Sequence, residues 1–290
     1  MQRVSRASRI YTLDPEQPPS ASIRSGEELI VETWDAFEGA RDAAALSEQT
    51  LRGPATGPIH VEGAQPGDAL RLEFISITPW GNAVHLVRPG RGFLDEEFSD
   101  PYATVLSIDE GDVVVRGRIR LPLATSMGFV ATTPTYRQST ASDSGAYGGD
   151  FDMKELCAGS TLYLPVLVPG GLLAMGDCHA VVGDGAVAGT GAECGAEVQI
   201  RVTVEKSLRL TSPRALTADH LVIMGYGEEL GPAMKQAVRG MVDYLVQERG
   251  LAPYDAYTLL SLAGDIRVSR TFRPISPVKM MLSRKVLDQL

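Results

Sequence analysis

Alternation of apolar and polar residues dominates the first two thirds of the chain and predicts β-strands. The run EELIVETWDAF at residues 27–37 alternates with a period of two, as a half-buried strand does. The run DALRLEFISIT at residues 68–78 follows the turn signal QPGD and carries apolar residues on both faces. Further strands are predicted at IYTLD, PIHVEG, TLYLPVLV, LLAMGDCHA and AEVQIRVTVEKSLRL. The pattern indicates a mainly β protein with a sandwich-like or barrel-like body.

The last 80 residues follow a different period. Pro253 is placed to begin a second helix, and DIRVSRTF reads as a returning strand. We therefore expect a β-rich catalytic body at residues 1–210 and a small C-terminal α/β part at residues 211–290, packed on the body. The first helix is predicted from a stripe with three- and four-residue spacing that Gly250 is placed to end: Leu230, Met234, Ala237, Val238, Met241 and Leu245.

Two stretches lack a regular period and are predicted as loops. Residues 81–110 contain His85, which we interpret as a surface residue more readily than as a metal ligand. The long polar run PTYRQSTASDSGAYGGDFD includes the segment 138–150, and loops of that length are uncommon unless they are functional. Asp150 and Asp152 follow its glycine pair, as turn caps or as members of a site.

Composition and charge narrow the class of protein. The 44% hydrophobic and 22% charged residues are ordinary for a globular chain. The net charge of −9 opposes binding to nucleic acid or to anionic lipid and favours a neutral or cationic small substrate. Three cysteines without a C-x-x-C pair suggest neither a disulfide framework nor a thiolate zinc site. Since we find no secretion signal and no membrane span, we expect a cytoplasmic protein.

Candidate chemistry concentrates in MGDCHAVVGDGAVAGTGAECGAE at residues 175–197. Asp177 and His179 lie two apart on a predicted strand, so both face one side and can offer oxygen and nitrogen to one cation. A buried aspartate bonded to a nearby histidine is the plainer alternative. Cys178 faces the opposite side, which leaves His179 badly placed to activate a thiolate nucleophile.

Three more acidic residues surround this pair. Asp184 stands between two glycines and is either a third ligand or a turn aspartate. Glu193 precedes the next strand, where it can act as a general base and then acid, or be a solvated strand-start residue. Glu197 fits the solvated interpretation better. The run GDGAVAGTG is not a dinucleotide site, because a strand and not a helix follows it.

Asp35 is the first candidate for a contribution from a distant strand. Trp34 and Asp35 close the strand at residues 27–37 and face a turn at Gly39, so Asp35 points toward a site at the sheet edge or caps the turn.

Three ordered blocks make the chain resemble the acetamidase/formamidase family of amide hydrolases. They are TGPIHVEGAQPGDAL at 56–70, FDMKELCAGSTLYLPVLVPGGLLAMGDCHAVVGDGAVAGTGAE at 151–193 and YDAYTLLSLAGDIRVS at 254–269. The resemblance implies a mostly β fold, hydrolysis of a short linear amide to a carboxylate and ammonia, and a divalent metal, zinc first and calcium second. It also implies a homodimer or a higher homo-oligomer.

The resemblance also implies positions for the site. The family's G-D-x-H motif falls on Gly176 to His179, its glycine-flanked aspartate on Asp184 and its glutamate on Glu193. Its early W-D position falls on Asp35, and the aspartate after the glycine pair falls on Asp152. We therefore expect Asp35, Asp177 and His179 as metal ligands, with Asp184 as an alternative ligand or catalytic residue and Glu193 as the base.

One region departs from the family pattern. Relatives often carry histidine before the glycine pair, where this chain reads STASDSGAYGG. This departure keeps two alternatives open: a hydrolase of a larger or cyclic amide, and a β-sandwich protein that binds a small molecule without turnover.

Overall fold

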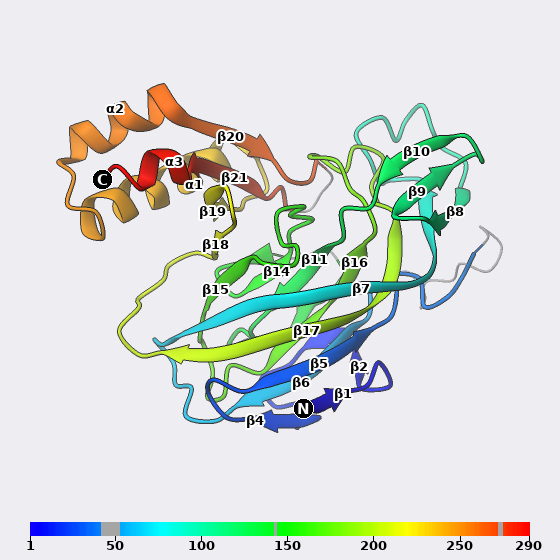
Figure 1. The fold of residues 1–290 in the computed structure, drawn as a ribbon, viewed down its shortest axis with the longest axis horizontal. Helices are drawn as coiled ribbons and strands as arrows, with labels where there is room; N and C mark the ends of the chain where they lie inside the picture. Colours follow the sequence, from blue (N-terminus) through cyan, green and yellow to red (C-terminus); the bar gives the residue numbers. More distant parts are fainter. Residues whose placement is uncertain (42–52, 142–143, 272–274) are drawn as a thin grey trace.

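A single strongly curled and largely antiparallel sheet forms the frame of the molecule (Figure 1). The computed structural model describes residues 1–41, 53–141, 144–271 and 275–290. The prediction of a mainly β protein is confirmed.

The centre of the sheet is a pair of long strands, β7 (Ala69–Val87) and β17 (Glu193–Glu205). β17 lies between β7 and β5 (Glu28–Thr33) and is antiparallel to both. Buried and partly exposed residues alternate along β5 and along residues 196–202 of β17, as the sequence pattern predicts. Their buried faces join one large apolar core that extends through the body.

The strand that carries the candidate chemistry is β16 (Leu173–His179). It pairs with β11 (Ser126–Ala131) along one edge, and with β6 (Ala55–Val61) and the start of β17 along the other. The other strands of the body are β1 (Gln2–Val4), β2 (Arg9–Ile10), β3 (Thr12–Leu13), β4 (Ala21–Ile23), β8 (Tyr102–Asp109), β9 (Asp112–Val115), β10 (Ile119–Pro122), β12 (Gln138–Ser139), β13 (Ser144–Gly145), β14 (Gly148–Asp150) and β15 (Thr161–Pro165).

The C-terminal part places three helices beside the last strands (Figure 1). One face of α1 (Leu230–Gln247) is buried against β19 and β21, through Ala233, Ala237, Met241 and Leu245. The helix α2 (Pro253–Ala263) begins at Pro253, as predicted. The remaining elements are β18 (Arg214–Leu216), β19 (His220–Gly225), β20 (Gly264–Val268), β21 (Val278–Ser283) and α3 (Arg284–Leu287).

Two large hydrophobic clusters lie in the described residues, and the first includes Val222 and Met281 from the C-terminal part. The first fills the body, and the second lies under α1 and α2. The sheet also continues across the junction, because β18 pairs with both β15 and β19. We keep the boundary at residues 210 and 211 as a proposal.

One strand is much longer than the sequence pattern indicates. The sequence predicts an irregular stretch at residues 81–110, but residues 81–87 continue β7 to Val87. This extension pairs with β8 on one side and with the start of β17 on the other, and it buries Val84 and Leu86 against Phe37. Tertiary pairing here overrides a local sequence that contains Pro79 and Gly81.

Among the helices of the described residues, none is both long enough and apolar enough to cross a membrane.

Candidate active site at the end of β16

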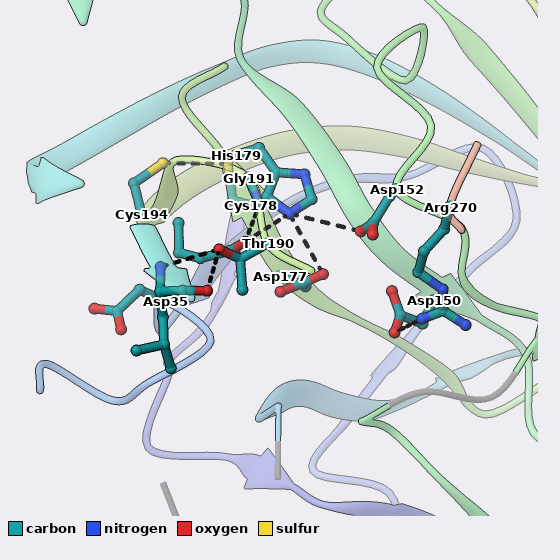
Figure 2. A network of polar contacts seen from close by, with 12 residues as sticks. Asp35, Asp150, Asp152, Asp177, Cys178, His179, Thr190, Gly191, Cys194 and Arg270 are labelled. Atoms are coloured by element: carbon teal, nitrogen blue, oxygen red, sulfur yellow. Dashed lines mark hydrogen bonds and ion pairs between the residues drawn. The ribbon is translucent and has the colours of Figure 1, made fainter. Parts of the chain in front are cut away.

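His179 is the centre of a buried cluster of carboxylates (Figure 2). Its Nε2 atom lies 3.6 Å from Asp177 Oδ2 and 3.2 Å from Glu193 Oε1. Asp177 and His179 come from β16, and Glu193 begins β17 directly opposite His179 in the pairing register. The His179 and Glu193 side chains are 1% and 2% exposed. The strand pairing thus explains why these three residues meet.

Asp152 joins the cluster from a different part of the chain. Its Oδ1 lies 3.6 Å from His179 Nε2. The backbone carbonyl of Gly128 on β11 accepts hydrogen bonds from the amides of Phe151 and Asp152, which fixes the approach of that segment to the end of β16. Sequence spacing alone could not place Asp152 here, because 25 residues separate it from Asp177.

Both aspartates that face His179 have an unusual backbone conformation. Asp177 has φ 55° and Asp152 has φ 48°, in the left-handed region that non-glycine residues rarely adopt. Such conformations persist where the surrounding structure holds them, often at functional sites. Gly128 leaves space for the side chains of Asp177 and His179, since a Cβ at this position would lie 2.5 Å from Asp177 Oδ2 and 2.6 Å from His179 Cε1. The surrounding structure thus holds Asp152 and Asp177 in unfavourable backbone conformations that bring their carboxylates to His179.

Burial and mutual repulsion shift the ionisation of this cluster. Burial, followed by the negative charge of Glu193, raises the pKa of Asp177 well above its usual range. Burial also raises the pKa of Asp152. Burial alone would lower the pKa of His179, but Glu193 and Asp177 together raise it well above its usual value. Several negative charges around one imidazole are therefore costly unless a further cation joins them.

The donor set fits a divalent metal ion. One ligand atom each from Asp152, Asp177 and His179 lies within 4.8 Å of the other two. Two carboxylate oxygens and one imidazole nitrogen are a donor set that zinc accepts, with a position left for water or substrate. Calcium takes six to eight oxygen ligands, which suits an imidazole less well. Two buried atoms of the cluster, His179 Nδ1 and Glu193 Oε2, have no hydrogen-bond partner among the described residues.

A small pocket opens onto the cluster. Its cavity volume is about 50 Å³, and one water needs roughly 10–15 Å³ of such space, so it admits a ligand of the size of a few waters. The described residues that line it combine the carboxylates of the cluster with two arginines and small residues: Ala36, Phe37, Gly53, Arg88, Arg91, Thr140, Ala141, Asp150, Asp152, Asp177, Gly189, Thr190 and Glu193.

A buried ion pair lies beside the cluster in Figure 2. Arg270, which follows β20 in the C-terminal part, donates to Asp150 Oδ2 and to the backbone carbonyl of Ile275. Burial raises the pKa of Asp150 to about 7, against the opposing effect of Arg270. Asp150 was a candidate from the sequence, but Arg270 was not. An isolated arginine at the end of a strand gives no sequence signal of such a role.

Comparison with known proteins identifies the family. Residues 10–142 and 137–274 match the model of the acetamidase/formamidase family. The chain belongs to this family. The acetamidase of Bacillus halodurans, a solved structure, is 34% identical, with a TM-score of 0.94 and 99% of each chain covered.

More distant relatives agree with this placement. A putative formamidase of Schizosaccharomyces pombe is 25% identical, over 86% of this chain and 82% of that protein. The formamidase of Methylophilus methylotrophus is 26% identical over 61% of this chain and 59% of that protein. The family resemblance expected from the three sequence blocks is confirmed.

Asp35 does not join the cluster in this acetamidase/formamidase family member. Its Oδ1 accepts hydrogen bonds from the amides of Phe37 and Gly39, and its Oδ2 accepts one from Arg41. In this structure the Asp35 carboxylate caps a turn, the alternative that the sequence had left open. Its assignment as a metal ligand stays a prediction. Asp152 takes the third position of the ligand group.

Asp184 also lies outside the cluster. Its carboxylate accepts a hydrogen bond from Lys279 on β21 and forms an ion pair with Lys154, at distances of 2.5 Å and 2.8 Å. Burial tends to raise its pKa, but these two lysines lower it below the usual value. The oxygens of Asp184 are thus held by cations that do not line the pocket, and its role as a ligand or catalytic residue stays a prediction.

Three other residues considered in the sequence, His85, Glu197 and Cys178, are not part of the group that could hold a metal. His85 lies within β7 opposite Thr104, and burial lowers its pKa. Glu197 is exposed and pairs with Arg3, in line with the solvated interpretation. Cys178 is fully buried, with its sulfur 3.8 Å from that of Cys194. The hydrogen bond with Cys194 and burial raise the pKa of the Cys178 thiol well above its usual value, which opposes a thiolate nucleophile.

Proposed function

We propose that this chain hydrolyses a short linear amide to a carboxylate and ammonia, with a divalent metal held by Asp152, Asp177 and His179. The observation that carries the proposal is the convergence of these three side chains, within 4.8 Å of one another, in a buried cluster that also contains Glu193. Membership of the acetamidase/formamidase family supports the same activity.

Each residue of the cluster has a defined task in this proposal. A cation bound there supplies a Lewis acid for the amide carbonyl and lowers the pKa of water. The two aspartates and the imidazole hold that cation at the end of β16. His179 must be neutral to bind through its nitrogen, so metal binding competes with protonation of this imidazole, whose pKa the surrounding carboxylates raise.

Glu193 is placed to move the proton of the reaction. Its Oε1 accepts a hydrogen bond of 2.7 Å from the amide of Gly191, which fixes the carboxylate in the pocket wall. Its Oε2 is buried without a partner among the described residues and is therefore free to accept a proton from the attacking water. The same oxygen then returns the proton to the leaving nitrogen, so that ammonia departs.

The cluster argues against the alternative of a binding protein without turnover. A site that only binds a neutral amide needs a few well-placed hydrogen-bond donors and acceptors. Buried carboxylates that repel each other destabilise the folded protein, and proteins retain such groups chiefly where chemistry requires them. The choice between a linear and a larger or cyclic amide rests on the pocket, whose small volume favours the short linear class.

The proposal is tested by ammonia release from formamide and acetamide. Purified protein is stripped with a chelator, reloaded with zinc and assayed at each stage. We expect activity that the chelator removes and zinc restores. Absence of ammonia release from the zinc-loaded, correctly folded protein would refute hydrolysis of these amides.

Three further expectations belong to this proposal. Zinc is the metal that the donor set favours. The assembly is a homodimer or a higher homo-oligomer, and the compartment is the cytoplasm. Metal analysis, light scattering and cell fractionation test them separately.

A further inference from the structure

Two arginines follow directly after β7 and line the candidate pocket. Arg88 and Arg91 enclose a turn in which the amide of Arg91 donates to the carbonyl of Arg88 at 3.2 Å. Both side chains line the same pocket as Asp152, Asp177 and Glu193. A guanidinium group presents paired N–H donors that match the two oxygens of a carboxylate.

The two arginines differ in their partners. Burial lowers the pKa of Arg91, and the nearby carboxylates of Asp150, Asp152 and Asp177 oppose that shift. None of the described carboxylates acts on Arg88, whose pKa is lowered to about 10 by burial and by the neighbouring Arg91. The charges of the described carboxylates thus act on Arg91 but not on Arg88, although both residues line the pocket.

The Arg88 side chain has no hydrogen-bonding partner among the described residues. Within residues 1–41, 53–141, 144–271 and 275–290, its guanidinium takes part in no hydrogen bond, ion pair or aromatic contact. The residue is partly buried, so its charge has lost part of its hydration without a compensating anion. An unpaired cation in the wall of a binding pocket is suited to an anionic group of the ligand.

We propose that Arg88 forms a carboxylate subsite, and that the substrate is a short amide with a carboxylate at the end away from the bond that is cleaved. This inference rests on the proposed amide hydrolysis and narrows its substrate class to half-amides of short dicarboxylic acids. Water adds to the amide carbon, the carbon–nitrogen bond breaks and both protons of the water end on the nitrogen, which yields a dicarboxylate and ammonium. The small cavity limits the chain between the two groups to very few carbons.

The test compares two probes that differ almost only in charge. Malonamate carries one amide and one carboxylate, and malonamide is its neutral counterpart with a second amide. We expect the zinc-loaded protein to have a kcat/KM for malonamate about 10- to 100-fold above that for malonamide. In Arg88→Met this ratio should fall toward one, and in Arg88→Lys it should be intermediate. Arg118→Met, which removes an exposed arginine in the turn before β10, is the control and should keep the ratio.

A binding measurement separates this inference from the proposed function. Glu193→Gln blocks proton transfer, so calorimetry can measure malonamate binding without turnover. Adding Arg88→Met should weaken that binding at least about tenfold, and adding Arg118→Met should leave it unchanged. If the parent protein releases no ammonia from any amide but malonamate binding still depends on Arg88, the hydrolysis proposal fails and the subsite stands. The subsite would be overturned if the ratio of kcat/KM for malonamate to that for malonamide were one or less in the parent protein. It would also be overturned if Arg88→Met left malonamate binding unchanged.

Discussion

At His179, three carboxylates approach one imidazole nitrogen within 3.6 Å. This arrangement gives the residues different tasks, although all of them are acidic. Asp152 and Asp177 belong to the group that can hold a cation, and Glu193 has a free oxygen and a backbone anchor. Substitution should therefore separate metal binding from proton transfer.

We expect Glu193→Gln to retain the metal and to lose about 10²- to 10⁴-fold in kcat, because glutamine cannot accept a proton. Asp177→Asn should instead lose metal occupancy, since a neutral amide is a poorer ligand for the cation. Metal analysis and steady-state kinetics on the same preparations check both. Equal loss of metal in the two variants would show that Glu193 is a ligand and not the base.

At Gly128, β11 lies so close to the Asp177 and His179 side chains of β16 that no side chain fits there. We expect Gly128→Ala to displace Asp177 and His179, because the added methyl group would lie 2.5–2.6 Å from their side chains. Activity and metal content should both fall sharply. Gly183→Ala is the matched control, because a Cβ at that position meets no atom within 4 Å. Metal analysis of both variants checks this, and normal metal binding by Gly128→Ala would contradict it.

The elements differ in how far the sequence predicted them. Strands β5 and β17 and helices α1 and α2 followed from local periodicity, because each buries one face. The pair Asp177 and His179 followed from spacing on one strand, and Glu193 from its place before the next strand. Asp152 was a candidate from its place after the glycine pair and from the family resemblance, and the roles of Arg88 and Arg270 had no local signal. Those residues reach the site through strand pairing across long separations, which the period of a single segment does not encode.

An ion pair between Asp184 and Lys279 joins the segment after β16 to strand β21 of the C-terminal part. Lys279 is fully buried and is neutralised by Asp184 and Glu155. The pKa of Asp184 is below its usual value, so its contribution to stability is present above about pH 4 and is lost as the pH falls through its folded value. We expect Asp184→Asn to lower the free energy of unfolding by about 1–3 kcal/mol at pH 7.

Denaturant unfolding of both proteins between pH 3 and pH 7 measures this difference. It should shrink as the pH falls below about 4 and through the lowered folded pKa of Asp184, where the parent carboxylate becomes protonated as well. A constant difference across the range would contradict the role assigned to the two lysines. Amide hydrolysis by Asp184→Asn, measured where it is folded, should persist because Asp184 does not line the pocket.

Across the whole molecule, the C-terminal part completes the surroundings of the site. Arg270, from that part, neutralises Asp150 on β14, and both side chains are buried. The isolated bridge between Gly185 and Arg270 and the hydrogen bond from Thr271 to Gly185 join the same two regions. The body and the C-terminal part are therefore expected to unfold together.

We expect Arg270→Met to destabilise the protein by about 3–5 kcal/mol, because it leaves Asp150 buried without its cation. Adding Asp150→Asn should restore part of the stability, because it removes the buried carboxylate charge that Arg270 no longer neutralises. Arg267→Met is the control, since Arg267 is 40% exposed and only loosely paired with Asp184. Thermal unfolding of the parent protein and these three variants checks this. No recovery in the double variant would mean that Arg270 acts through other contacts.

The central claim is that Asp152, Asp177 and His179 together hold the catalytic metal. Anomalous diffraction from crystals of the zinc-loaded protein, recorded at the zinc absorption edge, tests it most directly. The account predicts one strong peak at about 2.0–2.2 Å from an oxygen of each aspartate and from a nitrogen of His179. A peak at Asp35 or Asp184, or a cluster without a peak in active protein, would contradict it.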